Sequence, residues 1–158
     1  MAKEIERKFL IEPELWKQLD KPKGQHYNQG YIGGNEDVTI RIRIAEDKGY
    51  LTLKGKTVGI SRDEFEYEIP HGEATAMISS FTTSGIEKIR YKIAQGDLIW
   101  EVDEFLGSNA GLIVAEIELQ YEEQAFDRPA WIAEEVTEDH RYFNSNLATN
   151  PYCNWETK

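Results

Sequence analysis

The feature of this chain that most constrains its fold is a strict two-residue alternation of apolar and charged side chains. The clearest case is the segment 38–44, where isoleucines occupy one face and Thr39, Arg41 and Arg43 the other. Successive side chains of a β-strand point to opposite faces. The segment is therefore predicted to be a strand with one apolar face and one charged face.

The same alternation recurs along most of the chain. The predicted strands are 4–11, 26–32, 38–44, 50–54, 62–69, 88–93, 98–105 and 112–121. Glycine-bearing turns at 47–49 and 95–97 predict hairpins, and the short connections favour antiparallel pairing throughout. Helices are expected over 13–19, 72–81 and 122–126, and from Glu138 towards Ala148 with Thr137 as the capping residue.

Charged side chains gather on one face of nearly every predicted strand. The acidic positions are Glu4, Glu6, Glu64, Glu66, Glu101, Asp103, Glu116 and Glu118. The basic positions are Lys8, Arg41, Arg43, Lys54, Arg62, Lys88 and Arg90. Two architectures accommodate such a face: a flat sheet whose charges are solvated, or an eight-stranded barrel whose charges converge on a polar lumen.

Charges of the same sign occur in pairs within single strands, and this sorting favours the barrel. A face that served solubility alone would more often mix the two signs within each strand. Pairs of carboxylates suit Mg²⁺ or Mn²⁺, whereas pairs of arginine and lysine suit phosphate oxygens. A metal ion and basic side chains around a polyphosphate form the arrangement that phosphoryl transfer requires.

Composition narrows the class of protein further. The 158 residues fit a single domain, 1–158, and the net charge of −11 argues against binding a nucleic acid polymer. We expect a cytoplasmic protein without a membrane span, because Cys153 is the single cysteine and no signal-peptide run is present. The apolar outer faces outnumber the helices that could cover them, so we expect a homodimer.

The ordered set of motifs resembles a known superfamily. Glu4-x-Glu6-x-Lys8 is similar to the ExExK signature of the CYTH, or triphosphate tunnel metalloenzyme, superfamily. The match continues through Arg41-x-Arg43, Lys54, Arg62-x-Glu64-x-Glu66, Lys88-x-Arg90, Asp103 and Glu116-x-Glu118. It extends into 136–144, which resembles the C-terminal helix of short bacterial members. The resemblance thus covers almost the entire chain.

The resemblance implies an α+β, mainly antiparallel β fold: an eight-stranded closed barrel, or tunnel, with a charged lumen and a few covering helices. It assigns the phosphate oxygens to Lys8, Arg41, Arg43, Lys54, Arg62, Lys88 and Arg90. It assigns Mg²⁺ or Mn²⁺ to Glu4, Glu6, Glu64, Glu66, Asp103, Glu116 and Glu118. Glu4, Glu6 and Lys88 are the expected catalytic residues. Tyr31 and Arg141 are weaker candidates, for which barrel packing and a helix-capping contact are the structural alternatives.

The activity that the resemblance implies is metal-dependent hydrolysis of inorganic tripolyphosphate, or a related organic triphosphate, to phosphate and pyrophosphate. An adenylate cyclase that forms cyclic AMP from ATP is the alternative within the superfamily. A third reading is a module that binds polyphosphate or a nucleotide without turnover.

Overall fold

The computed structural model describes residues 3–156, and these form nine strands and three α-helices. The strands are β1 (Lys3–Ile11), β2 (Gln25–Asn35), β3 (Val38–Ala45), β4 (Lys48–Gly55), β5 (Ser61–Ile69), β6 (Thr82–Gln95), β7 (Leu98–Phe105), β8 (Ile113–Glu118) and β9 (Ile132–Glu135). The helices are α1 (Pro13–Gln18), α2 (His71–Phe81) and α3 (Asn144–Thr149). Short 3₁₀ turns lie at Gly107–Asn109, His140–Tyr142 and Tyr152–Asn154.

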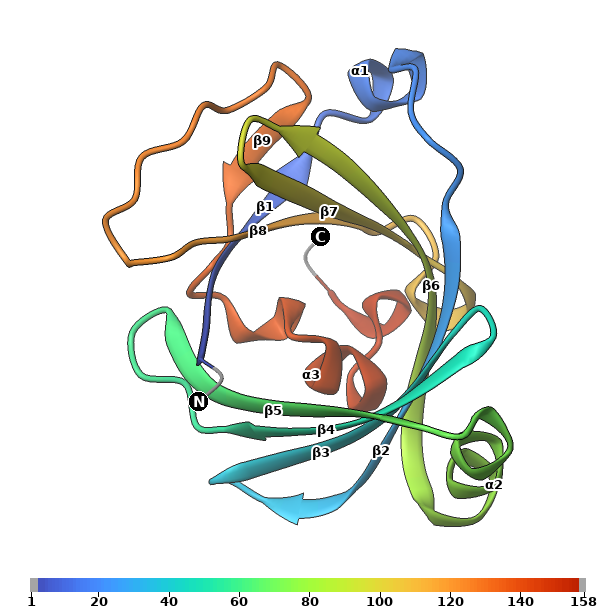
Figure 1. Cartoon of the computed structure of the whole chain (residues 1–158). Coiled ribbons are helices and arrows are strands. Elements are labelled where there is room, and N and C mark those ends of the chain that lie inside the picture. The colour runs from blue at the N-terminus through green and yellow to red at the C-terminus, as the bar shows by residue number, and fades with distance from the viewer. Residues whose placement is uncertain (1–2, 157–158) are drawn as a thin grey trace.

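Eight antiparallel strands close into a barrel, which confirms the predicted fold. The strand order is β5-β4-β3-β2-β6-β7-β8-β1, and the ring closes where Glu4 of β1 pairs with Arg62 of β5. The rest of β1 pairs with β8, with Glu6 opposite Glu118 and Lys8 opposite Glu116. Figure 1 shows the strands as a ring, with α1 and α2 outside it and α3 within its outline.

The alternation along each strand divides the side chains between the lumen and the outer surface. Even-numbered residues of β1 face the lumen, and the odd-numbered Phe9 lies outside in a buried apolar cluster with Trp16, Trp100 and Trp131. Phe9 and Trp100 meet edge to face, with ring centroids 5.5 Å apart. We call this group the outer cluster. It buries the outer face of β1, β7 and β8 beneath α1 and the connection that precedes β9.

The lumen face changes from charged to apolar towards one end of the barrel. Leu10 on β1 and Phe105 on β7 follow a charged lumen position by two residues. Ile86 on β6 and Val114 on β8 precede one by two residues, so all four lie at the same end of the antiparallel barrel. These side chains pack against the C-terminal segment, through the buried residues Val136, Tyr142, Leu147 and Trp155. We call this second group the floor cluster. It fixes α3 against the charged part of the lumen.

Helix α2 covers part of the barrel at β4. A Cβ at Gly49 would stand 2.6 Å from the Cβ of Ala74, which is too close for two carbon atoms. The helix can pack this tightly on the strand only because residue 49 is a glycine. Farther along the same outer surface, Phe65 and Tyr67 of β5 remain exposed. None of the helices within residues 3–156 has the length and apolar character needed to cross a membrane.

Two of the predicted helices are wrong. Residues 122–123 form a turn and 124–126 are irregular. The backbone N–H of Gln120 donates to the side chain of Gln124, which fixes this part of the connection between β8 and β9. The helix predicted from Glu138 is divided into the turn at His140–Tyr142 and α3, since Phe143 has the extended backbone angles φ −66° and ψ 134°.

Thr137 also does not cap a helix. Its hydroxyl accepts a hydrogen bond from the backbone N–H of Lys8 at 3.0 Å and donates to Glu135 at 2.6 Å. Asp139 caps the following turn instead, by accepting from the N–H of Arg141. A side chain that bonds the adjacent strand is unavailable for capping, so this long-range contact decides the local structure.

Strand bounds differ from the predictions mainly where polar residues pair in the sheet. Strand β6 begins at Thr82 and β2 extends to Asn35, whereas β8 ends at Glu118. Strand β9 was not predicted. It pairs with residues 9–11 of β1, on the same edge of β1 that pairs with β5 at residues 3–5. Arg7 of β1, which breaks the alternation, binds Glu135 of β9 through two hydrogen bonds of 2.7 and 2.5 Å.

Candidate active site

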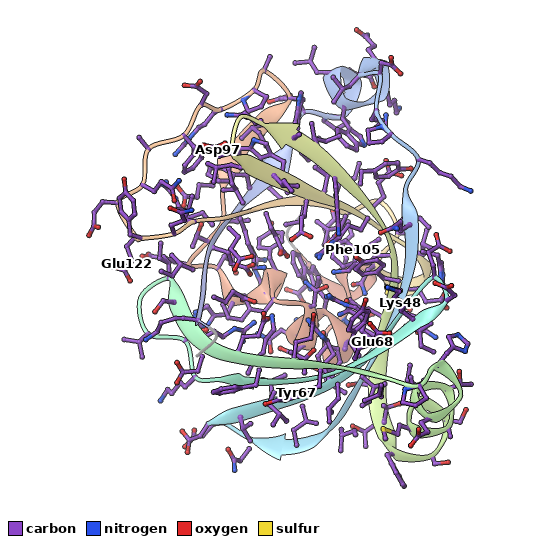
Figure 2. The ribbon with its side chains drawn as sticks, viewed as in Figure 1. Lys48, Tyr67, Glu68, Asp97, Phe105 and Glu122 are labelled. Atoms are coloured by element: carbon purple, nitrogen blue, oxygen red, sulfur yellow. The ribbon has the colours of Figure 1, made fainter. Side chains whose placement is uncertain are left out.

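The barrel encloses a cavity of about 190 Å³ that is lined almost entirely by charged side chains. Figure 2 shows side chains from opposite strands filling the interior of the ring. The lining comprises Glu4, Glu6, Lys8, Tyr31, Thr39, Arg41, Arg43, Lys54, Arg62, Glu64, Glu66, Lys88, Arg90, Glu101, Glu116, Glu118, Asn144 and Ser145. The alternation of eight strands thus brings the predicted acidic and basic positions to one place.

Arg41 is buried in this cavity with one donor unused. Its Nη2 donates to the hydroxyl of Thr52 at 3.2 Å and to Glu66 at 3.4 Å. Its Nε is the one buried side-chain donor or acceptor within residues 3–156 that lacks a hydrogen-bond partner. An unsatisfied buried donor costs free energy, so Arg41 retains an unused capacity to bind one further acceptor.

Arg43 lies next to Arg41 without a carboxylate partner among the described residues. Its Nε donates to Gln29 at 2.7 Å, and its guanidinium stands 4.8 Å from the centre of the Tyr27 ring. Burial, together with the positive charges of Arg41 and Arg90, lowers the pKa of Arg43 to about 10. Burial is the larger cause of this shift, and the two neighbouring guanidinium groups add to it.

The carboxylates of β1 and β8 hold the ammonium of Lys8. Lys8 Nζ lies 2.9 Å from an oxygen of Glu6 and 2.9 Å from an oxygen of Glu116. Burial alone would lower the pKa of Lys8, but the charges of Glu116 and Glu6 raise it above its ordinary value. The positive charges of Lys8, Arg90 and Lys88 hold the pKa of Glu116 well below its usual range, against the effect of burial.

A second group of ion pairs lies at the seam where the barrel closes. Lys54 Nζ lies 2.9 Å from Glu4 and 3.2 Å from Glu64. Arg62 approaches the other oxygen of Glu4 at 3.5 Å. Burial and the charge of Arg41 lower the pKa of Lys54.

Lys88 is fully buried between a carboxylate and an amide. Its Nζ donates to Asp103 at 2.8 Å and to Asn144 at 2.7 Å. Arg90 binds the same Asp103 through two bonds of 2.7 and 2.8 Å. Burial and the adjacent charge of Arg90 lower the pKa of Lys88 to about 7, well below that of an ordinary lysine.

Glu118 marks the acidic end of the cavity. Partial burial, followed by the negative charges of Glu4, Glu6 and Glu64, raises the pKa of Glu118 to about 7, although part of the side chain is exposed to water. Burial and the charge of Glu116 raise the pKa of Glu6 as well. Carboxylates that raise one another's pKa in this way form a region where a cation would be stabilised.

The carboxylate oxygens of the acidic residues are suitable ligands for a hard divalent cation. In the structure, however, these side chains do not surround a common centre. Across residues 3–156, no group of three acidic, histidine or cysteine side chains stands in an arrangement that could hold a metal. Lys8 and Lys54 occupy the carboxylate oxygens of Glu6, Glu116 and Glu4. A cation held by these carboxylates would therefore compete with the two lysines for them.

Two predicted residues lie outside the cavity lining. Asp103 faces the lumen side of β7, but both of its oxygens are engaged by Arg90 and Lys88, and it is fully buried. Arg141 is exposed and binds Asp139 at 2.7 Å, in the turn that precedes α3. Tyr31 does line the cavity and accepts a hydrogen bond from Gln29 at 3.0 Å.

Sequence reasoning missed several lining residues. Glu101 shares the charged face of β7, and Asn144 falls within the segment 136–144 that carries the resemblance, but neither was assigned a role. Thr39 and Ser145 carry no charge that would have drawn attention. The parity of the strand positions was sufficient to find Glu101 and Thr39. No pattern in the sequence links Asn144 to Lys88, which is 56 residues away along the chain.

Comparison with known proteins supplies independent findings. A family model described as the CYTH domain matches residues 2–150. An inorganic triphosphatase of Acetivibrio thermocellus is 52% identical over 99% of both chains. One of Nitrosomonas europaea is 36% identical over 92% of this chain and 96% of its own. The solved structure of an inorganic triphosphatase is 30% identical, covers 91% of this chain and 96% of its own, and has a TM-score of 0.63.

Proposed function

The chain belongs to the CYTH domain family, and from this premise we propose that it is a metal-dependent inorganic triphosphatase. The proposed reaction hydrolyses tripolyphosphate to phosphate and pyrophosphate inside the barrel. Two relatives, 52% and 36% identical over nearly their whole lengths, carry the name inorganic triphosphatase and support this choice.

The observation that carries the proposal is the lumen itself, which presents buried cations to a cavity of about 190 Å³. Arg41 leaves its Nε without a partner there, and Arg43 has no carboxylate to bind. The proposed ligands of the phosphate oxygens are Lys8, Arg41, Arg43, Lys54, Arg62, Lys88 and Arg90, all of which line the cavity. Arginine gives directional, paired hydrogen bonds to phosphate, and lysine adds compact charge.

We assign the metal to the acidic end of the cavity, with Mg²⁺ or Mn²⁺ as the expected ions. Glu4, Glu6, Glu64, Glu116 and Glu118 would supply its oxygen ligands, and Glu66 extends this acidic set. When bound, the metal neutralises charge that develops on the phosphate oxygens in the transition state. Asp103 takes a different part in the proposal: it holds Arg90 and Lys88 in place.

The chain's own side chains provide the remaining steps. Glu4 and Glu6 project from β1 into the cavity, where a carboxylate can orient a water for in-line attack and accept its proton. The bond between the terminal phosphorus and the bridging oxygen then breaks. Lys88 Nζ, whose pKa is lowered to about 7, can stabilise the leaving pyrophosphate and give it a proton.

A substrate panel tests the proposed function. Phosphate release from tripolyphosphate, ATP and thiamine triphosphate is measured with Mg²⁺ and with Mn²⁺, together with cyclic AMP formation from ATP. We expect release from tripolyphosphate to dominate. Exclusive formation of cyclic AMP would favour the cyclase, and tight binding without turnover under either metal would favour a binding module.

Two broader expectations remain predictions. A homodimer is favoured by the exposed Phe65 and Tyr67 on the outer face of β5, and sedimentation velocity would test it. A cytoplasmic location rests on the single cysteine, Cys153, which is free and exposed in the structure.

A further inference from the structure

The first turn of α3 lies at the border between the floor cluster and the charged part of the cavity. Leu147, in the second turn, is fully buried in the floor cluster, whereas Asn144 and Ser145 line the cavity. Because apolar packing fixes the helix, its first side chains are held in place against the charged lumen. Figure 1 shows α3 within the outline of the barrel, consistent with these contacts.

Asn144 contacts the proposed substrate ligand that is most deeply buried. Lys88 Nζ donates to its amide oxygen at 2.7 Å, and to Asp103 Oδ2 at 2.8 Å. An ammonium group has three donors, so these two acceptors leave one hydrogen that can point towards the cavity. Two fixed acceptors thus define the direction in which Lys88 presents its remaining donor.

The choice of an amide has an electrostatic reason. Asp103 already shares its charge between Arg90 and Lys88. A second carboxylate at position 144 would neutralise Lys88, whereas the neutral amide holds the ammonium and leaves its charge available to an anion.

Phe143, the residue before Asn144, also contacts charged residues of the cavity. The ring centre of Phe143 lies 5.7 Å from Lys8 Nζ and 5.5 Å from the guanidinium of Arg62. Phe143 in turn stacks on His140, with ring centroids 4.6 Å apart. The start of α3 therefore contacts three of the proposed phosphate ligands.

We propose that Asn144 is a positioning residue, which holds the Lys88 ammonium so that its free N–H faces the bound phosphate. The inference rests on the proposed function, since it deepens the role of one ligand of that site. Asn144 itself acts through Lys88. Its loss would leave the ammonium tethered at Asp103 alone, free to rotate away from the cavity.

A double-mutant cycle with a binding readout tests this inference. Tripolyphosphate binding is measured by calorimetry without metal, for the wild type, Asn144→Ala, Lys88→Met and the double variant. Methionine keeps most of the aliphatic length of Lys88, and Asp103 keeps both of its bonds to Arg90. Asn146→Ala is the matched control, because Asn146 lies on the same helix but its amide bonds the carbonyl of His140 at 2.7 Å.

We expect Asn144→Ala to weaken binding about tenfold in the wild-type background, the scale of losing a hydrogen bond to a charged group. In the Lys88→Met background the same change should alter affinity less than about twofold, and Asn146→Ala should leave affinity unchanged. If Asn144→Ala lowers the melting temperature, Asn144→Ser enters the same cycle, since serine suits a helix start but its hydroxyl stops short of Lys88.

Two results would overturn the inference while the proposed function stands. One is equal weakening by Asn144→Ala in both backgrounds, and the other is unchanged affinity in the wild-type background. A wild-type protein that binds no tripolyphosphate, and releases no phosphate from it with Mg²⁺ or Mn²⁺, would instead overturn the proposed function, and the inference with it.

Discussion

The ammonium of Lys54 lies 2.9 Å from a carboxylate oxygen of Glu4, across the seam at which the barrel closes. One residue is a proposed ligand of phosphate and the other a proposed ligand of metal. Lys8 and Glu6 repeat this relationship, also at 2.9 Å. Without ligands, the two halves of the site therefore partly neutralise each other, and binding of either ligand would compete with these ion pairs.

We predict that metal and tripolyphosphate bind cooperatively. An anion that takes Lys8 and Lys54 frees the carboxylates for metal, and thermodynamic linkage requires the reverse effect to be equal. A non-hydrolysable imidotriphosphate should tighten Mg²⁺ binding by at least about fivefold, the lower end of typical coupling. Calorimetry at several fixed concentrations of the analogue measures this, after correction for the Mg²⁺ that the free analogue binds. Identical Mg²⁺ affinity with and without the analogue would contradict the prediction.

Glu4 and Glu6 should be essential to hydrolysis and dispensable for folding. The double change Glu4→Gln and Glu6→Gln removes two proposed metal ligands but keeps side-chain size, so we expect at least about 100-fold loss of phosphate release. Circular dichroism should show an unchanged strand signal. The exposed pair Glu122→Gln and Glu123→Gln is the charge-matched control. If the Glu4 and Glu6 double variant retains activity, the assignment of these residues as metal ligands is contradicted.

Lys88 should make tripolyphosphate binding weaken as the pH rises. Its pKa of about 7 lies below that of an ordinary lysine, so the empty site loses this positive charge above pH 7. The charged form binds phosphate, and affinity should therefore fall by up to about tenfold per pH unit above 7. Calorimetry between pH 6 and 9 measures the slope. Subtracting the pH profile of Lys88→Met removes the titration of the ligand itself. If the difference between the two profiles has no slope, Lys88 is not the group responsible.

Glu118 should lower stability at neutral pH. Its pKa of about 7 lies above the ordinary value of 4.5, so its ionisation is opposed in the folded state. The resulting cost to stability is absent below pH 4.5, grows as the pH rises to about 7, and is constant above it. Glu118→Gln should therefore raise the melting temperature at pH 8, by a small amount because water around this exposed residue screens the neighbouring charges, and change it little at pH 4.5. The exposed Glu138→Gln is the control, and an equal rise in both variants would refute the assignment.

The paired hydrogen bonds between Arg7 and Glu135 should contribute to stability but not to activity. They join β1 to β9 on the outside of the barrel and leave the lumen untouched. Arg7→Met should cost about 1 kcal/mol, or roughly 3 °C in melting temperature, with kcat unchanged. Arg128→Met is the matched control, because Arg128 approaches the same carboxylate only at 3.5 Å and is half exposed. Equal losses from both variants would show that the paired geometry is unimportant.

The fold was predictable because the information lay in local alternation. Each charged strand face is readable from its own residues, and eight such faces with both signs favour closure around a lumen. The same reasoning placed Lys8, Arg41 and Glu118 in the cavity, where the structure finds them. The predicted roles of the individual residues remain proposals.

What failed depended on contacts between distant residues. Asp103 and Glu101 have the same parity on β7, and only the arrangement of Arg90 and Lys88 separates the buried anchor from the cavity residue. Thr137 looked like a helix cap because its bond to Lys8 is invisible in the local sequence. Short polar segments have weak preferences of their own, so tertiary contacts decide their structure.

The closing of the barrel by β1 has a consequence for how the chain folds. Strand β1 pairs with β5 at one end and with β8 and β9 at the other, so its partners lie more than fifty and more than one hundred residues away. Contacts of such long sequence separation form slowly, because the loop entropy is lost before they are made. Four proposed ligands, Glu4, Glu6, Lys54 and Arg62, meet at that seam. The proposed site is therefore complete only when β1 has paired with both of its neighbours in the barrel.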